Sequence, residues 1–341
     1  MDDMDLKHAA WEILPAFGIK SEVLECGELL RYQYPEPDQM RLIFKATCAD
    51  RAPLVIKLIS ERDHPRALME EQSAFSEHLR KHGIPTARRY PAAQEYCAEI
   101  KIGGVCAVVT VEDFMANEIT LIDGENIRKI GGMLARAHNI AAWDDCHVNG
   151  KTLFNALDRN DLFSYAYFVA LKQRFAGEGS ELFAEIQERG AKRLRGIERL
   201  RVRKMYATQG DVSDCNLFQT PDGQIGMFDF NNCGDNYLLS DAILEGIFVA
   251  RLMDYVEPIT EEAGRSLFLA FMDGYEEERS LTAEDMEIIP DLYAVTNAFW
   301  LGDLEYGEEA LVKKLEIGEQ EAVLTRLRSI VKTLNDPFPY H

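Results

Sequence analysis

The sequence predicts an α+β protein of two lobes: a small lobe rich in antiparallel strands, then a larger, mainly helical lobe. Three observations lead to this prediction. Strand-like runs with one helical segment fill residues 40–111, a helical pattern fills 127–334, and one β-like stretch at 205–230 interrupts the helices. The 341 residues are enough for two such lobes. We therefore predict domains 1–115 and 116–341.

The expected elements of the small lobe are a hairpin, a helix and two more strands. A short polar stretch separates strand-like runs at 40–46 and 52–58, which is typical of an antiparallel hairpin. A helix is expected over 66–82, because apolar residues recur there at a helical spacing and Gly83 follows. Further strand-like runs stand at 95–102 and 104–111.

The larger lobe should contain helices and one hairpin. Helical patterns occupy 127–142, 161–176, 180–200 and the segment from the hairpin to about 334. Between them, Pro221-Asp222-Gly223 predicts a turn, because proline presets φ and glycine tolerates a positive φ. Residues 217–219 should therefore fold back against 224–228.

The charge of the chain limits its partners. It has 37 Lys and Arg against 58 Asp and Glu, a net charge of −21. This argues against a nucleic acid or an anionic membrane surface as the partner, because both draw on clustered positive charge. The segment 245–321 alone has 20 acidic and 5 basic residues. Its carboxylates form either solvated helix faces or a wall that attracts cations, and composition does not separate the two.

The cellular location follows from similar observations. The acidic start of the chain has no apolar stretch behind it, and no apolar run approaches the ~20 residues that span a bilayer. The seven cysteines are scattered without a C-x-x-C pair, which favours neither a disulfide framework nor a zinc site. We expect a reduced, cytoplasmic protein that does not enter the membrane.

Three polar residues surround the open end of the predicted hairpin. Asn216 enters the hairpin and Asp229 leaves it, so antiparallel pairing should place them side by side. An amide oxygen and a carboxylate are hard ligands that suit Mg²⁺. Asp211 lies five residues before Asn216 and could accept a proton from an attacking hydroxyl. Each aspartate alone could merely cap a turn, but three such groups at one hairpin end favour a site.

This segment resembles the signature of a known family. G-D-x4-N, followed by a strand, a turn and an apolar-D-F, is similar to the motif of aminoglycoside phosphotransferases and their choline-kinase-like relatives, whose fold is protein-kinase-like. The resemblance covers most of the chain, and only 209–241 is highly specific. It implies that Asp211 is the catalytic base and that Asn216 and Asp229 bind Mg²⁺. Asp241 matches an aspartate that supports the catalytic loop.

The resemblance also assigns the nucleotide side. Lys57 looks like the strand lysine that pairs with the nucleotide phosphates. Positions 68, 71, 75 and 79 follow a helical period, so we expect Glu71 rather than Glu70 to face inward and hold Lys57. The adenine should meet backbone groups at the hinge, near Glu112 and Phe114.

The chain departs from the family pattern at two points. Gln209 stands where the family usually has a histidine that orients the catalytic loop; an amide can also donate and accept hydrogen bonds. No clear glycine-rich phosphate loop is present, and 26–29, with one glycine, stands in its place. His138, on an amphipathic helix, is interpreted as a packed structural residue. The change at Gln209 makes a nucleotide-binding pseudokinase the alternative function.

The function expected from the sequence is a Mg²⁺-dependent phosphotransferase that moves the γ-phosphoryl group of ATP or GTP to a hydroxyl of a small molecule. Trp300, Asp303 and Glu305 could cradle an amine, or could equally be a core residue and two solvated acids. The acidic segment favours a cationic acceptor, such as an aminoglycoside, a choline-like molecule or another metabolite. The sequence indicates neither the choice between ATP and GTP nor the oligomeric state.

Overall fold

The computed structural model of the chain describes residues 5–36, 39–102, 104–119, 122–158, 160–251, 260–338 and 340. The chain folds into two compact units. The first comprises Met1–Ile119, Cys146–Gly150 and Cys215–Cys233, and the second comprises Thr120–Asp145, Lys151–Asp214 and Gly234–His341. Among the described residues, no helix is both long and apolar enough to cross a membrane.

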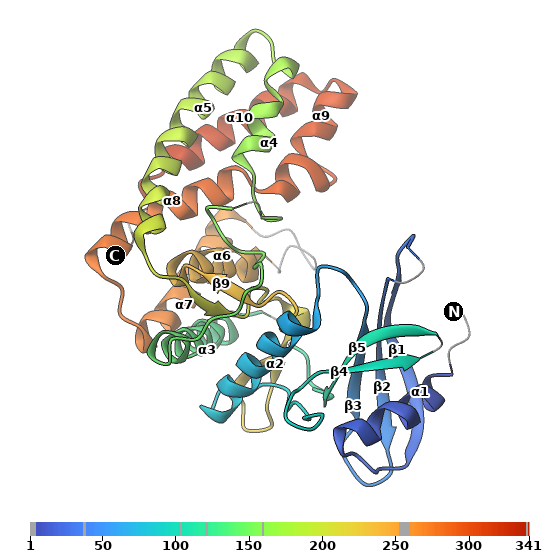
Figure 1. The fold of residues 1–341 in the computed structure, drawn as a ribbon. Helices are drawn as coiled ribbons and strands as arrows, with labels where there is room; N and C mark the ends of the chain where they lie inside the picture. The colour runs from blue at the N-terminus through green and yellow to red at the C-terminus, as the bar shows by residue number, and fades with distance from the viewer. Residues whose placement is uncertain are drawn as a thin grey trace. The chain divides into compact units, whose positions relative to one another are not determined.

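A five-stranded antiparallel sheet forms the body of the first unit (Figure 1), in the order β1-β2-β3-β5-β4. Its strands are β1 (Val23–Gln33), β2 (Met40–Cys48), β3 (Leu54–Ile59), β4 (Ala98–Ile102) and β5 (Val105–Asp113). The structure confirms the predicted hairpin, now β2 and β3, and the two strands that follow the first long helix. Strand β1 was not predicted; the segment 26–29 lies inside it, where Cys26 pairs with Ala46.

The two faces of this sheet differ in chemistry. Helix α1 (Leu6–Ile13) and the 3-10 turn Leu14–Phe17 pack on one face, together with Leu42, Phe44, Ile56 and Val111. Because side chains alternate along a strand, the residues between them point to the opposite face. That face includes Val55, Lys57, Ile59, Val108, Thr110 and Glu112, and Met69 of α2 (Arg66–Lys81) packs against Ile59.

Helix α2 is turned differently from the prediction. The buried positions follow the spacing 69, 72, 73 and 76 rather than 68, 71, 75 and 79, although Phe75 and Leu79 are buried as well. Glu71 is consequently exposed. A helix with apolar residues on a broad arc satisfies the same period in two rotations, which is why the period alone gave the wrong side.

The hairpin β7 (Leu217–Gln219) and β8 (Ile225–Met227) forms as predicted, with Leu217 opposite Met227. We expected it in the helical lobe, but it packs with the first unit. The Ile119 amide donates to Leu217 O at 3.1 Å and the Met227 amide to Pro85 O at 3.0 Å. These backbone bonds attach both strands of the hairpin to segments of the first unit.

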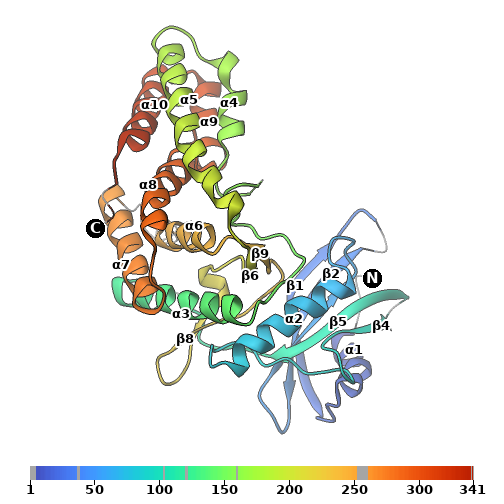
Figure 2. The ribbon, with the colours of Figure 1, turned by 60° about the vertical axis from the view of Figure 1, so that its left-hand side comes forward.

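The second unit is a set of helices with one small sheet. Its helices are α3 (Gly124–Trp143), α4 (Tyr165–Ala170), α5 (Glu178–Ile197), α6 (Leu238–Arg251), α7 (Glu261–Glu278), α8 (Ala283–Ala298), α9 (Leu311–Ile317) and α10 (Gln320–Asn335). Figure 2 shows α3 beside α7, and α5 beside α10. A Cβ added at Gly131 of α3 would lie 2.0 Å from Phe271 O, so this close helix contact requires glycine. The short strands β6 (Tyr206–Thr208) and β9 (Gly234–Asn236) pair with each other.

Candidate active site

The open end of the hairpin brings Asn216 and Asp229 together. The Phe228 amide donates to Asn216 O at 2.9 Å, which extends the β7–β8 pairing by one residue. Asp229 follows directly and has a φ of 53°, a left-handed backbone conformation that is uncommon for non-glycine residues and that aspartate adopts more readily than most. The structure thus confirms that these two residues are neighbours at the open end of the hairpin. Their role as metal ligands stays a prediction.

Lys57 connects this hairpin to the face of the sheet that carries Thr110 and Glu112. Its Nζ lies 3.1 Å from Asp229 Oδ1 and 3.1 Å from Glu112 Oε1. Glu112 Oε2 in turn lies 2.9 Å from a terminal nitrogen of Arg89. Lys57, Glu112 and Arg89 are all buried, with at most 6% exposure. Two cations and two carboxylates therefore form a chain of ion pairs that ends at Asp229.

The electrostatics of this network keep Asp229 ionised. Burial by itself would raise the pKa of Asp229, but the ammonium of Lys57 and the guanidinium of Arg89 outweigh it and lower the pKa. An ionised carboxylate is the form that binds a cation. Next to the network, Thr110 Oγ1 is buried without a hydrogen-bond partner among the described residues. Thr110 lies opposite Lys57 in the β3–β5 pairing.

The structure gives Lys57 a different partner from the predicted Glu71. Glu71 Oε2 accepts a hydrogen bond from the Asn149 amide at 2.8 Å. The neighbouring Gln72 is the buried residue, and its amide donates to Asn231 O at 2.8 Å and to Cys233 O at 3.1 Å. Helix α2 therefore holds the segment that follows Asp229, and the carboxylate for Lys57 comes from β5.

The hinge residues Glu112 and Phe114 make contacts that the sequence did not predict. The side chain of Glu112, rather than its backbone, faces the site through its pair with Lys57. The Phe114 amide donates to Pro53 O at 2.9 Å. The ammonium of Lys45 lies 4.0 Å above the Phe114 ring. Adenine binding at these two residues stays a prediction.

The loop that carries Asp211 belongs to the second unit and is fixed by successive hydrogen bonds. Gly210 has a φ of 80°, which favours glycine at the turn before Asp211. The Asp211 amide donates to Gln209 Oε1 at 2.8 Å, and the Ser213 amide to Asp211 O at 3.0 Å. Gln209 therefore supports the loop by accepting a hydrogen bond, as expected for its amide. The Val212 amide donates to the side chain of Glu245 on α6, which is not among the predicted site residues.

Asp241 bonds to the two short strands that flank this loop in the chain, and its support of the catalytic loop stays a prediction. It is fully buried and accepts hydrogen bonds from Thr208 Oγ1 at 2.8 Å and Asn236 Nδ2 at 3.0 Å. His138 Nε2 lies 3.0 Å from its other oxygen, and His138 Nδ1 lies 2.8 Å from the Tyr275 hydroxyl. Burial lowers the pKa of His138 despite the carboxylate, so the ring is neutral, with Nε2 as donor. His138 is thus a structural residue.

The predicted acceptor residues lie around the π-helical turn Gly302–Tyr306. Asp303 forms ion pairs with Arg326 at 2.6 Å and Arg251 at 3.4 Å, and lines a cavity of about 270 Å³. The Arg251 guanidinium lies 4.5 Å from the centre of the Trp300 ring. Glu305 is hydrogen-bonded to Tyr167, whose pKa is raised by burial and by this carboxylate. All three residues therefore have partners inside the second unit.

Arginines from other segments pair with part of the acidic segment 245–321. Ion pairs link it to α3, α5 and the turn after α5, through the pairs Arg128–Asp273, Arg136–Glu278, Arg193–Asp291 and Arg199–Glu287. These pairs account for part of the segment's charge, which favours the interpretation of solvated and bridging helix faces for those carboxylates.

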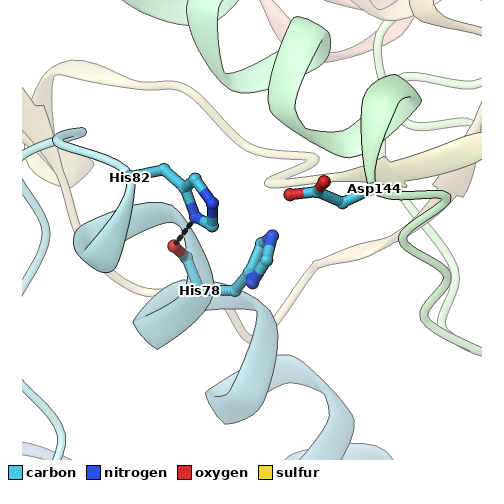
Figure 3. A group of neighbouring side chains, drawn as sticks. All are labelled: His78, His82 and Asp144. Atoms are coloured by element: carbon cyan, nitrogen blue, oxygen red, sulfur yellow. Dashed lines mark hydrogen bonds between the residues drawn. The ribbon is translucent and has the colours of Figure 1, made fainter.

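Two histidines at the end of α2 form a separate group outside this site. The rings of His78 and His82 lie 4.3 Å apart between their centres, and His82 Nδ1 lies 2.9 Å from the His78 carbonyl oxygen (Figure 3). His82 is the C-cap residue of the helix. A histidine ring near the C-terminus of a helix can satisfy one of the last carbonyl oxygens in this way.

Comparison with known proteins supports the fold. No family model and no curated protein matches the chain. Among solved structures it is similar to a microcompartment-associated aminopropanol kinase, with a TM-score of 0.56, 15% identity, and coverage of 95% of this chain and 98% of that one. The amicoumacin kinase hAmiN, in complex with AMP-PNP, Ca²⁺ and Ami, is similar with a TM-score of 0.53 and 15% identity, and the match covers 89% of this chain and 87% of that one. For an aminoglycoside phosphotransferase from Alicyclobacillus acidocaldarius the TM-score is 0.51 and the identity 13%, and the match covers 90% of this chain and 91% of that one.

These similarities extend over nearly the whole chain. The protein therefore has the two-lobed, kinase-like fold of aminoglycoside phosphotransferases and related small-molecule kinases, as the resemblance predicted. At 13–15% identity the similarity speaks for the fold alone.

Proposed function

We propose that the protein is a Mg²⁺-dependent phosphotransferase that transfers the γ-phosphoryl group of ATP or GTP to a hydroxyl of a small molecule. The observation that carries the proposal is the arrangement of polar groups at the open end of the β7–β8 hairpin. There Asn216 and Asp229 are neighbours, and Asp229 lies 3.1 Å from the buried Lys57. Oxygen ligands beside a fixed cation suit a metal-bound polyphosphate.

Asp211 is the proposed base. As the acceptor oxygen bonds to the γ-phosphorus, the bond to the bridging oxygen of the departing ADP or GDP breaks, and the hydroxyl proton passes to the Asp211 carboxylate. The hydrogen bonds on both sides of Asp211 support this role, because they hold the backbone that orients the carboxylate. In the chain, Asp211 stands five residues before Asn216.

The nucleotide is held by the first unit. Lys57 places its ammonium against phosphate oxygens, and Glu112 and Arg89 keep that ammonium in position. The donor set of Asn216 and Asp229 fits Mg²⁺, because both offer hard oxygen atoms and Lys57 favours the ionised form of Asp229. When bound there, Mg²⁺ would neutralise part of the phosphate charge.

The acceptor is proposed to be a small cation that bears a hydroxyl. The acidic segment 245–321 supports this choice, although Asp303 is already paired with two arginines. Glu305 is then the better of the two predicted carboxylates for an amine. The aminopropanol and amicoumacin kinases that share the fold make amino alcohols the first acceptors to test.

The test is ADP release with Mg-ATP and a panel of acceptors that includes aminopropanol, ethanolamine, choline, an aminoglycoside and a neutral sugar. Asp211→Asn should lower kcat by about 10²–10⁴-fold if the residue is the base. Asp222→Asn is the matched control, because Asp222 is an exposed aspartate in the hairpin turn. Full activity of Asp211→Asn would refute the assignment. Binding of Mg-ATP without turnover on any acceptor would favour the pseudokinase.

A further inference from the structure

The carboxyl group of Glu245 is fully buried next to the loop that carries Asp211. Glu245 lies on α6, one helical turn after Asp241, and has 0% exposure. Both of its carboxyl oxygens lie 3.0 Å from the backbone nitrogen of Val212. That nitrogen belongs to the peptide bond that joins Asp211 to Val212. A buried side chain is thus one hydrogen bond away from the backbone of the proposed base.

This bond differs from the others in the loop. The Asp211 amide bonds to Gln209 and the Ser213 amide bonds to Asp211, so both stay within the loop. Among the hydrogen bonds described for these three successive amides, that of Val212 is the one that reaches another element. Glu245 therefore connects the loop to helix α6, which packs against α3, α7 and α8.

The two buried carboxyl groups of α6 are held differently. Asp241 has three hydrogen-bonding partners: Thr208, Asn236 and His138. The described hydrogen bonds give Glu245 only the Val212 amide. A buried carboxylate needs several donors or a cation to remain charged. The proton is therefore expected on Glu245 rather than on Asp241.

The surrounding charges agree with this expectation. Burial raises the pKa of Glu245 well above its usual range, and the carboxylates of Asp241 and Asp211 act in the same direction. The hydrogen bond from the Val212 amide lowers this pKa but does not offset the other contributions. From the helices packed against α6, His138 of α3 donates a hydrogen bond to Asp241, and the hydroxyl of Tyr275 of α7 bonds to His138. Both His138 and Tyr275 are neutral. No cation acts on the Glu245 carboxyl among the described groups.

We propose that Glu245 is a positioning residue for phosphoryl transfer, whose buried carboxyl group holds the Asp211–Val212 peptide and so fixes the place of the Asp211 side chain. The catalytic part of this statement rests on the proposed function, whereas the attachment of the loop does not. A neutral carboxyl group is sufficient, because the Val212 amide needs only one oxygen acceptor. Glutamine supplies the same oxygen, and leucine supplies none.

Three variants test the proposal in the full chain. Glu245→Gln keeps the acceptor, Glu245→Leu removes it, and Val249→Ala opens a cavity at another fully buried position of the same helix. Hydrogen–deuterium exchange of peptides covering 207–214 reports on the loop. With Mg-ATP and an acceptor, kcat and the KM for the nucleotide report on catalysis.

Glu245→Leu should speed exchange in 207–214 and lower kcat by roughly 10- to 100-fold, with the nucleotide KM unchanged within about twofold. Glu245→Gln should keep kcat within about twofold of the wild type, and Val249→Ala should leave exchange in 207–214 as it is. Equal exchange in Glu245→Leu and Val249→Ala would overturn the proposal, as would a glutamine variant as impaired as the leucine variant. If the wild type turns over no acceptor but Glu245→Leu still frees the loop, the proposed function fails and the attachment of the loop stands.

Discussion

Each unit contains one buried polar network: the first surrounds Lys57, and the second supports the loop that carries Asp211. The two networks stabilise their buried carboxyl groups in different ways. In the first unit, Glu112 and Asp229 are matched by Lys57 and Arg89. In the second unit, Asp241 and Glu245 have no lysine or arginine partner in the described residues, and a neutral histidine and a proton take that place. The first network balances its carboxylates with cations, whereas in the second a proton neutralises Glu245 and neutral donors stabilise the charge of Asp241.

This difference predicts how each network breaks. An ion network fails when one partner is removed, because a buried charge is left without compensation. A proton-balanced network fails when pH changes the number of protons it holds. Mutation should therefore be the sharper probe of the first unit, and pH the sharper probe of the second.

The largest effect is expected from Glu112→Leu in the first unit. It leaves the Arg89 guanidinium buried without a carboxylate and should lower the free energy of unfolding by about 3–5 kcal/mol. The double variant Glu112→Leu/Arg89→Leu removes both charges and should recover most of that loss. Urea unfolding at pH 7 measures both values.

Glu99→Leu provides the control for Glu112→Leu. Glu99 is an exposed glutamate on β4 of the same sheet, where a substitution should change stability by no more than about 0.5 kcal/mol. The single variant Arg89→Leu completes the comparison. If the stability lost in the double variant equals the sum of the losses in Glu112→Leu and Arg89→Leu, the two residues do not interact, and the description as an ion network is wrong.

The next effect is the pH dependence that Glu245 gives to the second unit. Because its pKa is raised in the folded state, the unfolded chain releases this proton first, and stability falls as pH rises above about 4.5 toward the folded pKa. The free energy of unfolding of Glu245→Gln relative to the wild type should therefore rise by up to about 1.4 kcal/mol per pH unit within this window.

Urea unfolding of both proteins between pH 5 and pH 8 would measure this difference. Glu262→Gln, which removes an exposed carboxylate from α7, is the matched control. Parallel curves for the wild type and Glu245→Gln would mean that Glu245 is ionised in the folded protein, and the contrast between the two networks would disappear.

The sequence revealed the local part of the site. Asn216 and Asp229 were placed correctly because proline, glycine and antiparallel pairing determine a hairpin from adjacent residues. The fold class followed from the order of strand-like and helical periods. These features depend on interactions between residues that are close in the chain.

The partners of Lys57 and of the Asp211 loop depend on distant contacts. Glu112 reaches Lys57 only through the register of β3 on β5, which no local pattern specifies. Glu71 was chosen from a helical period that two rotations of α2 satisfy. Glu245 lies in an apolar helix, and its spacing of four residues from Asp241 was the one available signal.

His138 should affect the pH dependence of stability with the opposite sign. Because burial lowers its pKa, the unfolded chain takes up a proton that the folded protein does not, so stability falls as pH drops below about 6.5. His138→Gln keeps a donor and an acceptor and should remove up to about 1.4 kcal/mol of this loss per pH unit. His8→Gln, at an exposed position of α1, is the control. A His138→Gln curve that still falls as the wild type does would place the titrating group elsewhere.

The smallest effect should come from Gln209, which holds the amide of Asp211 as Glu245 holds that of Val212. Gln209→Ala removes the neutral hydrogen bond to the Asp211 amide. The loss of that bond should cost about 0.5–1.5 kcal/mol of stability, and up to roughly tenfold in kcat if the bond is also needed in the transition state. Gln219→Ala, a half-buried glutamine of β7, is the control for losing an amide side chain. Gln209→His tests whether a ring nitrogen can replace the amide oxygen as acceptor. If Gln209→Ala lowers kcat more than Glu245→Leu does, the loop is fixed mainly from within, and the buried network of the second unit supports the fold rather than the base.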